Sequence, residues 1–158
     1  MKNRIFTKLF IVVLAICCLS SCSDRLDIVF TDYYVCIKDE YGAATSNISS
    51  EVDDLTMTYY IYLVSPVLDH SVTVDYEIIS GDGLTEGIDY TLFTDSRSVT
   101  ISRGVTRMPI RITYNSNALD PTKDNTLTIR LTSCSDPSLI IGYPGPAANY
   151  SKHIVTKR

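Results

Sequence analysis

The amino-acid sequence predicts an all-β protein, an antiparallel sandwich of about seven short strands in a single domain over residues 28–158. The first observation behind this prediction is a period-two alternation of apolar and polar residues, which is typical of half-buried strands. The second is the regular spacing of turn residues between the alternating segments. The third is that no helical period follows the N-terminal segment, so no helix is expected in the domain.

The clearest alternation lies within residues 72–114. Residues 72–78 and 108–114 each alternate between apolar and polar side chains, which predicts two strands. Gly104 predicts a tight turn before the second strand, because glycine adopts a positive φ at little steric cost. Pro109 has no backbone N–H to donate, so we expect an edge or a bulge at that point.

The other predicted elements follow from the same pattern. Further strands are expected at residues 28–38, 56–65, 99–101, 127–132 and 153–156. Polar segments rich in Gly, Asn, Ser or Pro predict loops at residues 39–54, 115–125 and 133–149. The strand at 56–65 has apolar residues on both faces, so it should be central in its sheet. Tyr59, Tyr76 and Tyr114 are expected in the core, with their hydroxyl groups at its rim.

The N-terminal 21 residues are expected to be a targeting signal rather than part of the fold. Basic residues precede an unbroken apolar run at 9–19, which is shorter than the about 20 residues of a membrane-spanning helix. Leu19-Ser20-Ser21-Cys22 resembles the end of a bacterial lipoprotein signal, which implies cleavage before Cys22 and lipidation of that cysteine. The alternative is an ordinary secretory signal that is cut near Ser21. After cleavage before Cys22, residues 22–27 would be the lipidated cysteine and a tether.

The net charge of the domain limits the kinds of partner that we expect it to bind. Residues 1–21 carry three basic and no acidic residues, so their removal takes the formal net charge from −4 to −7. An acidic domain repels phosphate backbones, so no nucleic-acid partner is expected. The interrupted acidic stretch after Cys22 resembles a surface-export tag, which favours the outer membrane and the cell surface.

Cys36 and Cys134 form either a disulfide or two separate thiols, and the sequence leaves both readings open.

Several motifs in one order resemble the Calx-beta domain and its relatives in Bacteroidetes surface lipoproteins. The residues that carry the resemblance are Tyr76, Gly87-Ile88-Asp89-Tyr90, Val99-Thr100-Ile101, the turn at Gly104 and Leu127-Thr128-Ile129-Arg130-Leu131. The resemblance covers residues 55–155. The resemblance implies an immunoglobulin-like β-sandwich, and it implies much less about function because one fold hosts many functions.

The resemblance also suggests a calcium-binding site, because Calx-beta domains that bind calcium hold it with carboxylates in loops at one end of the sandwich. Calcium takes six to eight oxygen ligands, so several acidic residues must converge. The candidate metal ligands here are Asp53, Asp54 and Asp89. The acidic run that the calcium binders carry before the sixth strand is replaced here by two aspartates with a lysine between them. The alternative is that these are solvated loop acids and that Asp89 caps a turn. No other cofactor is expected.

Saccharide binding is the second candidate activity. The chain has 11 tyrosines and no tryptophan. Tyr60 and Tyr62 fall on one face of the strand at 56–65, where they would form a flat aromatic platform for sugar rings. Tyr41, Tyr143 and Tyr150 are expected in loops. The alternative is that such tyrosines belong to the core of the sandwich.

Catalysis is not expected. The only histidines are His70 and His153, and neither a nucleophile elbow nor a zinc-protease motif is present. The sequence therefore predicts a lipid-anchored binding or adhesion module of the cell envelope that is accessory to glycan capture. The alternative is a structural or assembly component of an envelope protein complex that pairs through an exposed sheet edge. Calcium-dependent adhesion is a variant of either.

Overall fold

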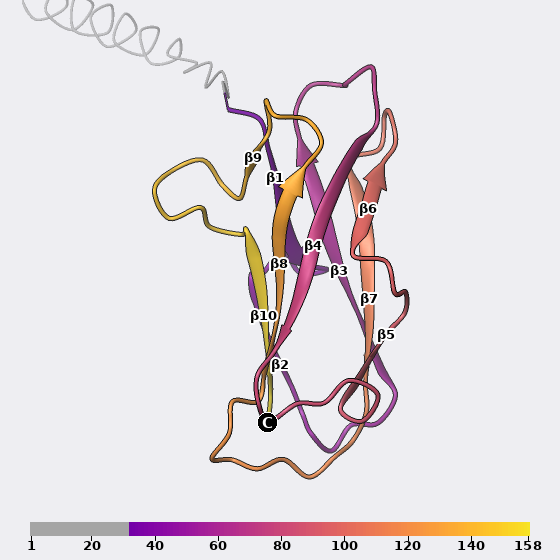
Figure 1. Cartoon of the computed structure of the whole chain (residues 1–158), viewed down its shortest axis with the longest axis vertical. Helices are drawn as coiled ribbons and strands as arrows, with labels where there is room; N and C mark the ends of the chain where they lie inside the picture. Colours follow the sequence, from indigo (N-terminus) through magenta and orange to yellow (C-terminus); the bar gives the residue numbers. More distant parts are fainter. Residues whose placement is uncertain (1–31) are drawn as a thin grey trace, which may run out of the picture. The chain divides into compact units, whose positions relative to one another are not determined.

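Two five-stranded sheets face each other across a shared apolar core (Figure 1). The computed structural model describes residues 32–158. Within that range all ten regular elements are strands, so the all-β sandwich prediction is confirmed. No helix among the described residues is long and apolar enough to cross a membrane. The predicted signal, the predicted lipidation site Cys22, the predicted tether and the start of the first predicted strand lie outside the described residues.

The two sheets, here called sheet A and sheet B, draw their strands from the whole length of the domain. Sheet A has the order β5 (Tyr90–Leu92), β7 (Arg107–Tyr114), β3 (Leu55–Val64), β1 (Tyr34–Asp39) and β9 (Ile140–Ile141). Sheet B has the order β2 (Thr45–Ile48), β10 (Lys152–Lys157), β8 (Thr126–Cys134), β4 (Val72–Ser80) and β6 (Ser98–Ile101). β3 is the middle strand of sheet A, as its two apolar faces predicted.

The prediction of purely antiparallel sheets is wrong at two places. β2 pairs in parallel with β10, and β9 pairs in parallel with β1. Both strands lie in segments that were predicted to be loops. β9 has only two residues, and β2 has four with one buried side chain, Ile48, so neither is long enough to show a period. Cys36 in sheet A and Cys134 in sheet B are both free thiols.

The core is built from alternate residues of the facing strands. Buried apolar side chains with little or no exposure include Val35, Ile37, Ile61, Val72, Val74, Ile110, Ile112, Leu127, Ile129 and Val155. Burying one such side chain fully contributes about 1.5–3 kcal/mol. The alternation that is visible in the sequence therefore decides which face of each strand points inward.

Pro109 lies at an open margin of sheet A, as the sequence predicted. β5 pairs only with the last three residues of β7, so the part of β7 around Pro109 has β3 on one side and, within residues 32–158, no strand on the other. The amide of Leu63 donates to the carbonyl of Thr106 at 2.8 Å. Hydrogen-bonded pairs alternate in an antiparallel ladder, so Tyr60 and Pro109 face each other as a non-hydrogen-bonded pair and proline costs no ladder bond.

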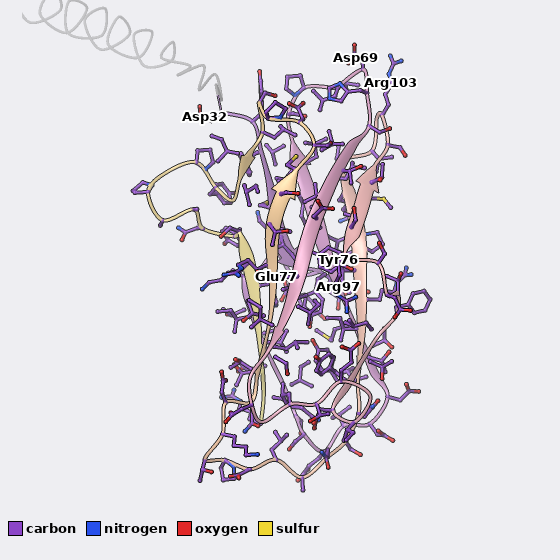
Figure 2. All side chains as sticks on the ribbon, in the orientation of Figure 1. Asp32, Asp69, Tyr76, Glu77, Arg97 and Arg103 are labelled. Carbon is purple, nitrogen blue, oxygen red and sulfur yellow. The ribbon has the colours of Figure 1, made fainter. Side chains whose placement is uncertain are left out.

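A short line of polar groups crosses the core between the sheets. The hydroxyls of Tyr59 and Tyr114 are 3.0 Å apart, and the Tyr59 ring packs 4.7 Å from the imidazole of His153. Both tyrosines are fully buried, so the core assignment is confirmed, but their hydroxyls bond to each other inside the core and not at its rim. Burial raises the pKa of Tyr59 to about 12. Tyr76 is also buried, and its hydroxyl donates to the carbonyl of Ser96 beside Arg97 (Figure 2).

His153 is completely buried, and both of its ring nitrogens have partners. Nδ1 is 3.1 Å from the carbonyl oxygen of Ala43, and Nε2 is 3.0 Å from the hydroxyl of Ser46. A neutral ring satisfies both contacts, since Nδ1–H donates to the carbonyl and Nε2 accepts from the hydroxyl. Burial lowers the pKa of His153 below its ordinary value. The histidine thereby holds the segment that contains β2 against β10.

The buried histidine predicts a loss of stability at mildly acidic pH. In the unfolded chain the His153 imidazole takes up a proton near pH 6.5, whereas in the folded chain the buried imidazole stays neutral. The free energy of unfolding should therefore fall as the pH drops below about 6.5. The slope for one such group is at most about 1.4 kcal/mol per pH unit. Urea unfolding of the His70→Gln protein between about pH 8 and 5.5 measures it. The His70→Gln substitution is needed because Asp69 and Asp136 raise the pKa of exposed His70. A raised pKa makes the free energy of unfolding increase as the pH falls, which would mask the effect of His153. Adding His153→Gln should flatten the slope, and an unchanged slope would contradict the assignment.

Candidate functional site

The loop that enters β5 places Asp89, the first of the predicted calcium ligands. The amide of Asp89 donates to the carbonyl of Thr85 at 2.8 Å, and Oδ2 of Asp89 accepts from the amide of Thr85 at 2.9 Å. Gly87 between them has a φ of 84°, a conformation that glycine adopts without strain. Asp89 therefore caps this turn through its side chain, as the alternative reading of the sequence held.

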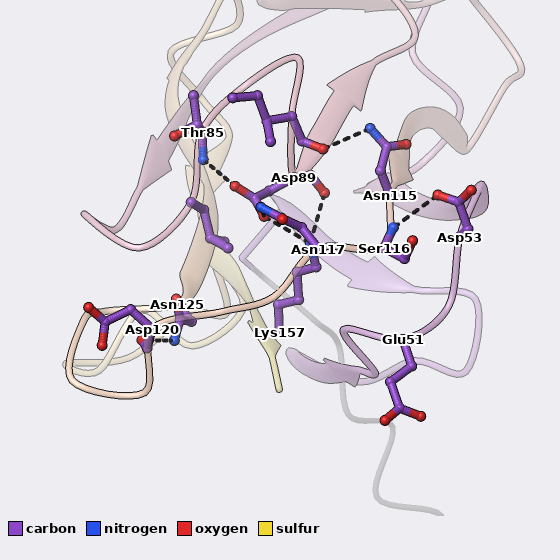
Figure 3. Close-up of polar contacts among 12 residues, drawn as sticks. Glu51, Asp53, Thr85, Asp89, Asn115, Ser116, Asn117, Asp120, Asn125 and Lys157 are labelled. Carbon is purple, nitrogen blue, oxygen red and sulfur yellow. Dashed lines mark hydrogen bonds and ion pairs between the residues drawn. The ribbon is translucent and has the colours of Figure 1, made fainter.

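The same carboxylate is half of a buried ion pair. Lys157 Nζ lies 3.0 Å from Oδ1 of Asp89, and the side-chain amide of Asn117 donates to that oxygen at 3.0 Å (Figure 3). Asp89 is 3 % exposed and Lys157 is 1 % exposed. Burial alone would raise the pKa of Asp89, but the hydrogen bond from Thr85, the Asn117 amide and the Lys157 ammonium outweigh it and lower that pKa. A cation from the chain itself already occupies this carboxylate.

The other two predicted calcium ligands have separate surroundings. Asp53 Oδ1 accepts a hydrogen bond from the amide of Ser116 at 2.9 Å, which links the β2–β3 and β7–β8 loops (Figure 3). Asp54 is exposed and has a left-handed φ of 55°. Within residues 32–158, no group of three or more His, Cys, Asp or Glu side chains is arranged to hold a metal ion. The structure thus does not bring Asp53, Asp54 and Asp89 together.

Sequence reasoning missed Lys157 as the partner of Asp89. The closing strand was predicted to end at residue 156, whereas β10 continues to Lys157. The signal was available, because His153, Val155 and Lys157 share one face by period-two alternation. A lysine at a core position needs a buried carboxylate nearby. Which carboxylate it finds depends on contacts between distant segments.

The predicted tyrosine pair lies on the outer face of sheet A. Tyr60 and Tyr62 are two residues apart on β3, opposite Pro109 and Arg107 of β7, and β1 lies on their other side. Both are half-buried, their ring centroids are 6.1 Å apart and their planes are tilted by 57°. The structure therefore brings these two rings together, but the predicted flat platform is wrong because the rings lie in different planes.

Lys38 extends this pair into a larger cluster. Its ammonium lies 5.9 Å from the ring centroid of Tyr62, 5.1 Å from that of Tyr143 and 4.7 Å from that of Tyr150. It is also 3.5 Å from the Tyr143 hydroxyl. These distances are in the range where an ammonium is attracted to an aromatic ring. Three rings therefore hold one cation at a defined place on the surface of β1.

Arg107 completes the cluster on the β7 side. Its guanidinium carbon lies 4.6 Å from the ring centroid of Tyr60 and 5.9 Å from that of Tyr62, and it donates to the Tyr62 hydroxyl at 3.4 Å. We name this cluster the cation–tyrosine face. It consists of Lys38, Tyr60, Tyr62, Arg107, Tyr143 and Tyr150.

The loop between β9 and β10 brings Tyr143 and Tyr150 onto sheet A. Its two ends bond to β1, with Gly142 donating to the carbonyl of Val35 at 2.8 Å and the carbonyl of Tyr150 accepting from Ile37 at 2.9 Å. A Cβ atom at Gly142 would lie 2.6 Å from the carbonyl oxygen of Ala148, so only glycine permits this close approach. The sequence identified these tyrosines as loop residues but had no local signal for their position beside β3.

The two histidines have different surroundings. His70 is exposed in the β3–β4 loop, where its ring nitrogens lie 2.9 Å from Asp69 and 3.1 Å from Asp136. Asp69 marks this end of the sandwich in Figure 2. Both ring nitrogens of His70 therefore face carboxylates. His153 is buried among the core contacts described above.

Comparison with known proteins identifies the fold. The structure is similar to the apo-form Calx CBD1 domain, with a TM-score of 0.50 and 14% sequence identity over 79% of this chain and 98% of that one. It is also similar to Bacteroides thetaiotamicron EndoBT-3987, crystallised with Man5GlcNAc product, with a TM-score of 0.50 and 7% identity. That match covers 77% of this chain and 30% of the EndoBT-3987 chain. No family model matches the sequence, and no curated protein matches it either. The chain therefore has a Calx-beta-like, immunoglobulin-like sandwich fold.

Removing either member of the buried ion pair should strongly destabilise the domain. Asp89→Asn leaves the Lys157 ammonium without a counter-charge, and Lys157→Met leaves the carboxylate without its cation. We expect each to lower the free energy of unfolding by about 3–5 kcal/mol, and the double variant to recover much of that loss. Urea unfolding measures all three. Arg130→Met is the matched control, because it breaks the exposed pair with Glu77 and should cost at most about 1 kcal/mol. Additive losses in the double variant would show that the pair is not coupled.

Calcium is not expected to raise the melting temperature, because the Asp89 carboxylate is already neutralised by Lys157. Thermal unfolding of the full-length protein with and without millimolar calcium measures this. A specific site at about a hundredfold excess over its Kd adds about 2.7 kcal/mol, which would move the midpoint by several degrees. Such a rise, if lost in Asp53→Asn, would restore the loop carboxylates as metal ligands.

Proposed function

We propose that this protein is a non-enzymatic, lipid-anchored binding module of the cell envelope that holds saccharides on the cation–tyrosine face. The lipid anchor is proposed at Cys22, and its support is the sequence around that residue. Several acyl chains give a stable anchor, because each buried CH₂ contributes about 0.8 kcal/mol. We place the domain at the outer membrane, exposed on the cell surface, where a module that captures glycans would meet them.

The observation that carries the saccharide proposal is the gathering of four tyrosines and two cations on one face. Sugar rings present C–H groups that pack on aromatic faces, and their hydroxyls need donors and acceptors close by. Here Tyr62 and Tyr143 keep their hydroxyls beside Arg107 and Lys38, at 3.4 and 3.5 Å. Because Tyr60 and Tyr62 are tilted by 57°, the two rings would contact neighbouring sugar units of one chain and not a single ring.

The structural neighbours do not supply this function. EndoBT-3987 was crystallised with a glycan product, but a likeness at 7% identity concerns the fold alone. The proposal therefore depends on the residues of this chain.

Assembly through a sheet edge is the second candidate, and the open margin of β7 is one such edge beside the end strands of the two sheets. An added strand needs backbone donors and acceptors along that margin. Pro109 has no N–H to offer, and Arg107 and Arg111 place charge on either side of it, which are features that natural proteins use to block strand addition. We therefore favour the face of sheet A over its edge.

Truncating the tyrosines of the face should weaken saccharide binding. Tyr60→Ala and Tyr62→Ala each remove an aromatic surface, and loss of a central contact residue typically costs about 2 kcal/mol, or about 30-fold in Kd. Glycan-array screening of the full-length protein in detergent identifies a bound saccharide, and titration calorimetry with that saccharide gives the Kd. Tyr41→Ala is the matched control, because Tyr41 is 83 % exposed and lies outside the face. If the array shows no binding, or if Tyr41→Ala weakens binding as much, the face is not the site.

A further inference from the structure

We propose that the saccharide held on the cation–tyrosine face is an acidic one, which carries carboxylate groups along its chain. This inference rests on the proposed function and specifies its ligand class. Its support is the distribution of charge over the two sheets and the geometry of Arg107 and Lys38.

Sheet A carries positive charge without exposed negative charge. Its strands contain three basic residues, Lys38, Arg107 and Arg111, and one acidic residue, Asp39. Asp39 is 3 % exposed, and one of its oxygens accepts the amides of Tyr41 at 3.0 Å and Ala43 at 2.7 Å. The loop that carries Tyr143 and Tyr150 contains no acidic residue either. The strands of sheet A therefore expose positive charge only, with the exposed Glu40 following directly after β1, in a domain whose overall charge is negative.

Sheet B shows that this segregation is specific to one face. Its outward positions mix Asp75 and Glu77 on β4 with Arg130 on β8 and Lys152 on β10. Glu77, which stands on β4 in Figure 2, forms an ion pair with Arg130. None of the three cations of sheet A has such a carboxylate partner within residues 32–158. Their charges are left for a ligand.

The guanidinium of Arg107 has donors to offer a carboxylate. Its carbon lies over the rings of Tyr60 and Tyr62, and one N–H is directed to the Tyr62 hydroxyl. A guanidinium has five N–H donors in a rigid fork, and that fork matches the two oxygens of a carboxylate. Arg107 is exposed, so its remaining N–H groups are accessible. A neutral sugar would leave this charge unused.

Lys38 supplies a second fixed charge on the other side of the tyrosine pair. Three rings surround its ammonium. Tyr62 contacts both cations, since its ring centroid lies 5.9 Å from the Lys38 ammonium and 5.9 Å from the Arg107 guanidinium carbon. Two cations on either side of a shared ring suit a saccharide chain in which apolar sugar faces alternate with carboxylate groups.

The test compares acids with their neutral esters. The probes are oligomers of galacturonic acid and of mannuronic acid, and the same oligomers with every carboxylate methyl-esterified. Titration calorimetry of the full-length protein in detergent should show at least about tenfold tighter binding of one acid than of its ester at low salt. The difference should shrink at about 1 M salt, where the Debye length is only about 3 Å.

Variants assign the effect to the face. Arg107→Gln should weaken binding of the acid about tenfold more than it weakens binding of the ester, and Arg107→Lys should fall between it and the unaltered protein. Lys38→Gln should act in the same direction. Arg103→Gln in the β6–β7 turn and Lys152→Gln on sheet B are matched controls that remove the same charges elsewhere. Urea unfolding confirms that each variant is folded.

Three outcomes overturn the inference and differ in what they mean for the proposed function. Equal affinity for an acid and its ester, with loss of both in Tyr62→Ala, would leave a saccharide site that does not select for charge. Failure to bind any of the four oligomers would overturn the acidic-ligand inference, and binding of a neutral glycan on the array would then keep the proposed function. Equal effects of Arg103→Gln and Arg107→Gln would show a response to net charge and not to the face.

Discussion

The buried pair between Asp89 and Lys157 is the interaction on which the rest of this sandwich depends. Asp89 precedes β5 of sheet A, and Lys157 ends β10 of sheet B, so their contact ties the two sheets together at one end. A charge in an apolar interior is tolerated only when it is paired and fully hydrogen-bonded. The Thr85 amide and the Asn117 side chain complete that bonding. The loops before β5 and after β7 are consequently held in one arrangement.

The sequence predicted the long strands well because their information is local. Alternation over eight or more residues, as in β4 and β7, identifies both the strand and its inward face. β2 and β9 escaped prediction because strands of two to four residues form only where a longer neighbour offers a partner. Lys157 escaped for a related reason. Its position on the core face was readable, but its carboxylate partner lies 68 residues away in the chain.

The candidate site shows the same division between local and distant information. That Tyr60 and Tyr62 share a face follows from the period of a strand, and this part of the prediction was local. The cations beside these tyrosines could not be predicted from the local sequence, because Arg107 faces Tyr62 through the register of β3 with β7. Lys38 reaches them through the register of β3 with β1. Register is set by the whole pairing of two strands, which no short motif records.

The overall charge of the chain is a poor guide to what this face would bind. A net charge of −7 for residues 22–158 repels a long polyanion, which must pass over many acidic loops. At physiological ionic strength, however, charges are screened beyond about 8 Å, so a short ligand responds to the groups within its own reach. On the outer face of sheet A those groups are Lys38 and Arg107, each fixed by aromatic rings. The acidic loops would then exclude extended polyanions while the face admits a short carboxylated chain, so that one domain combines repulsion at long range with attraction at contact.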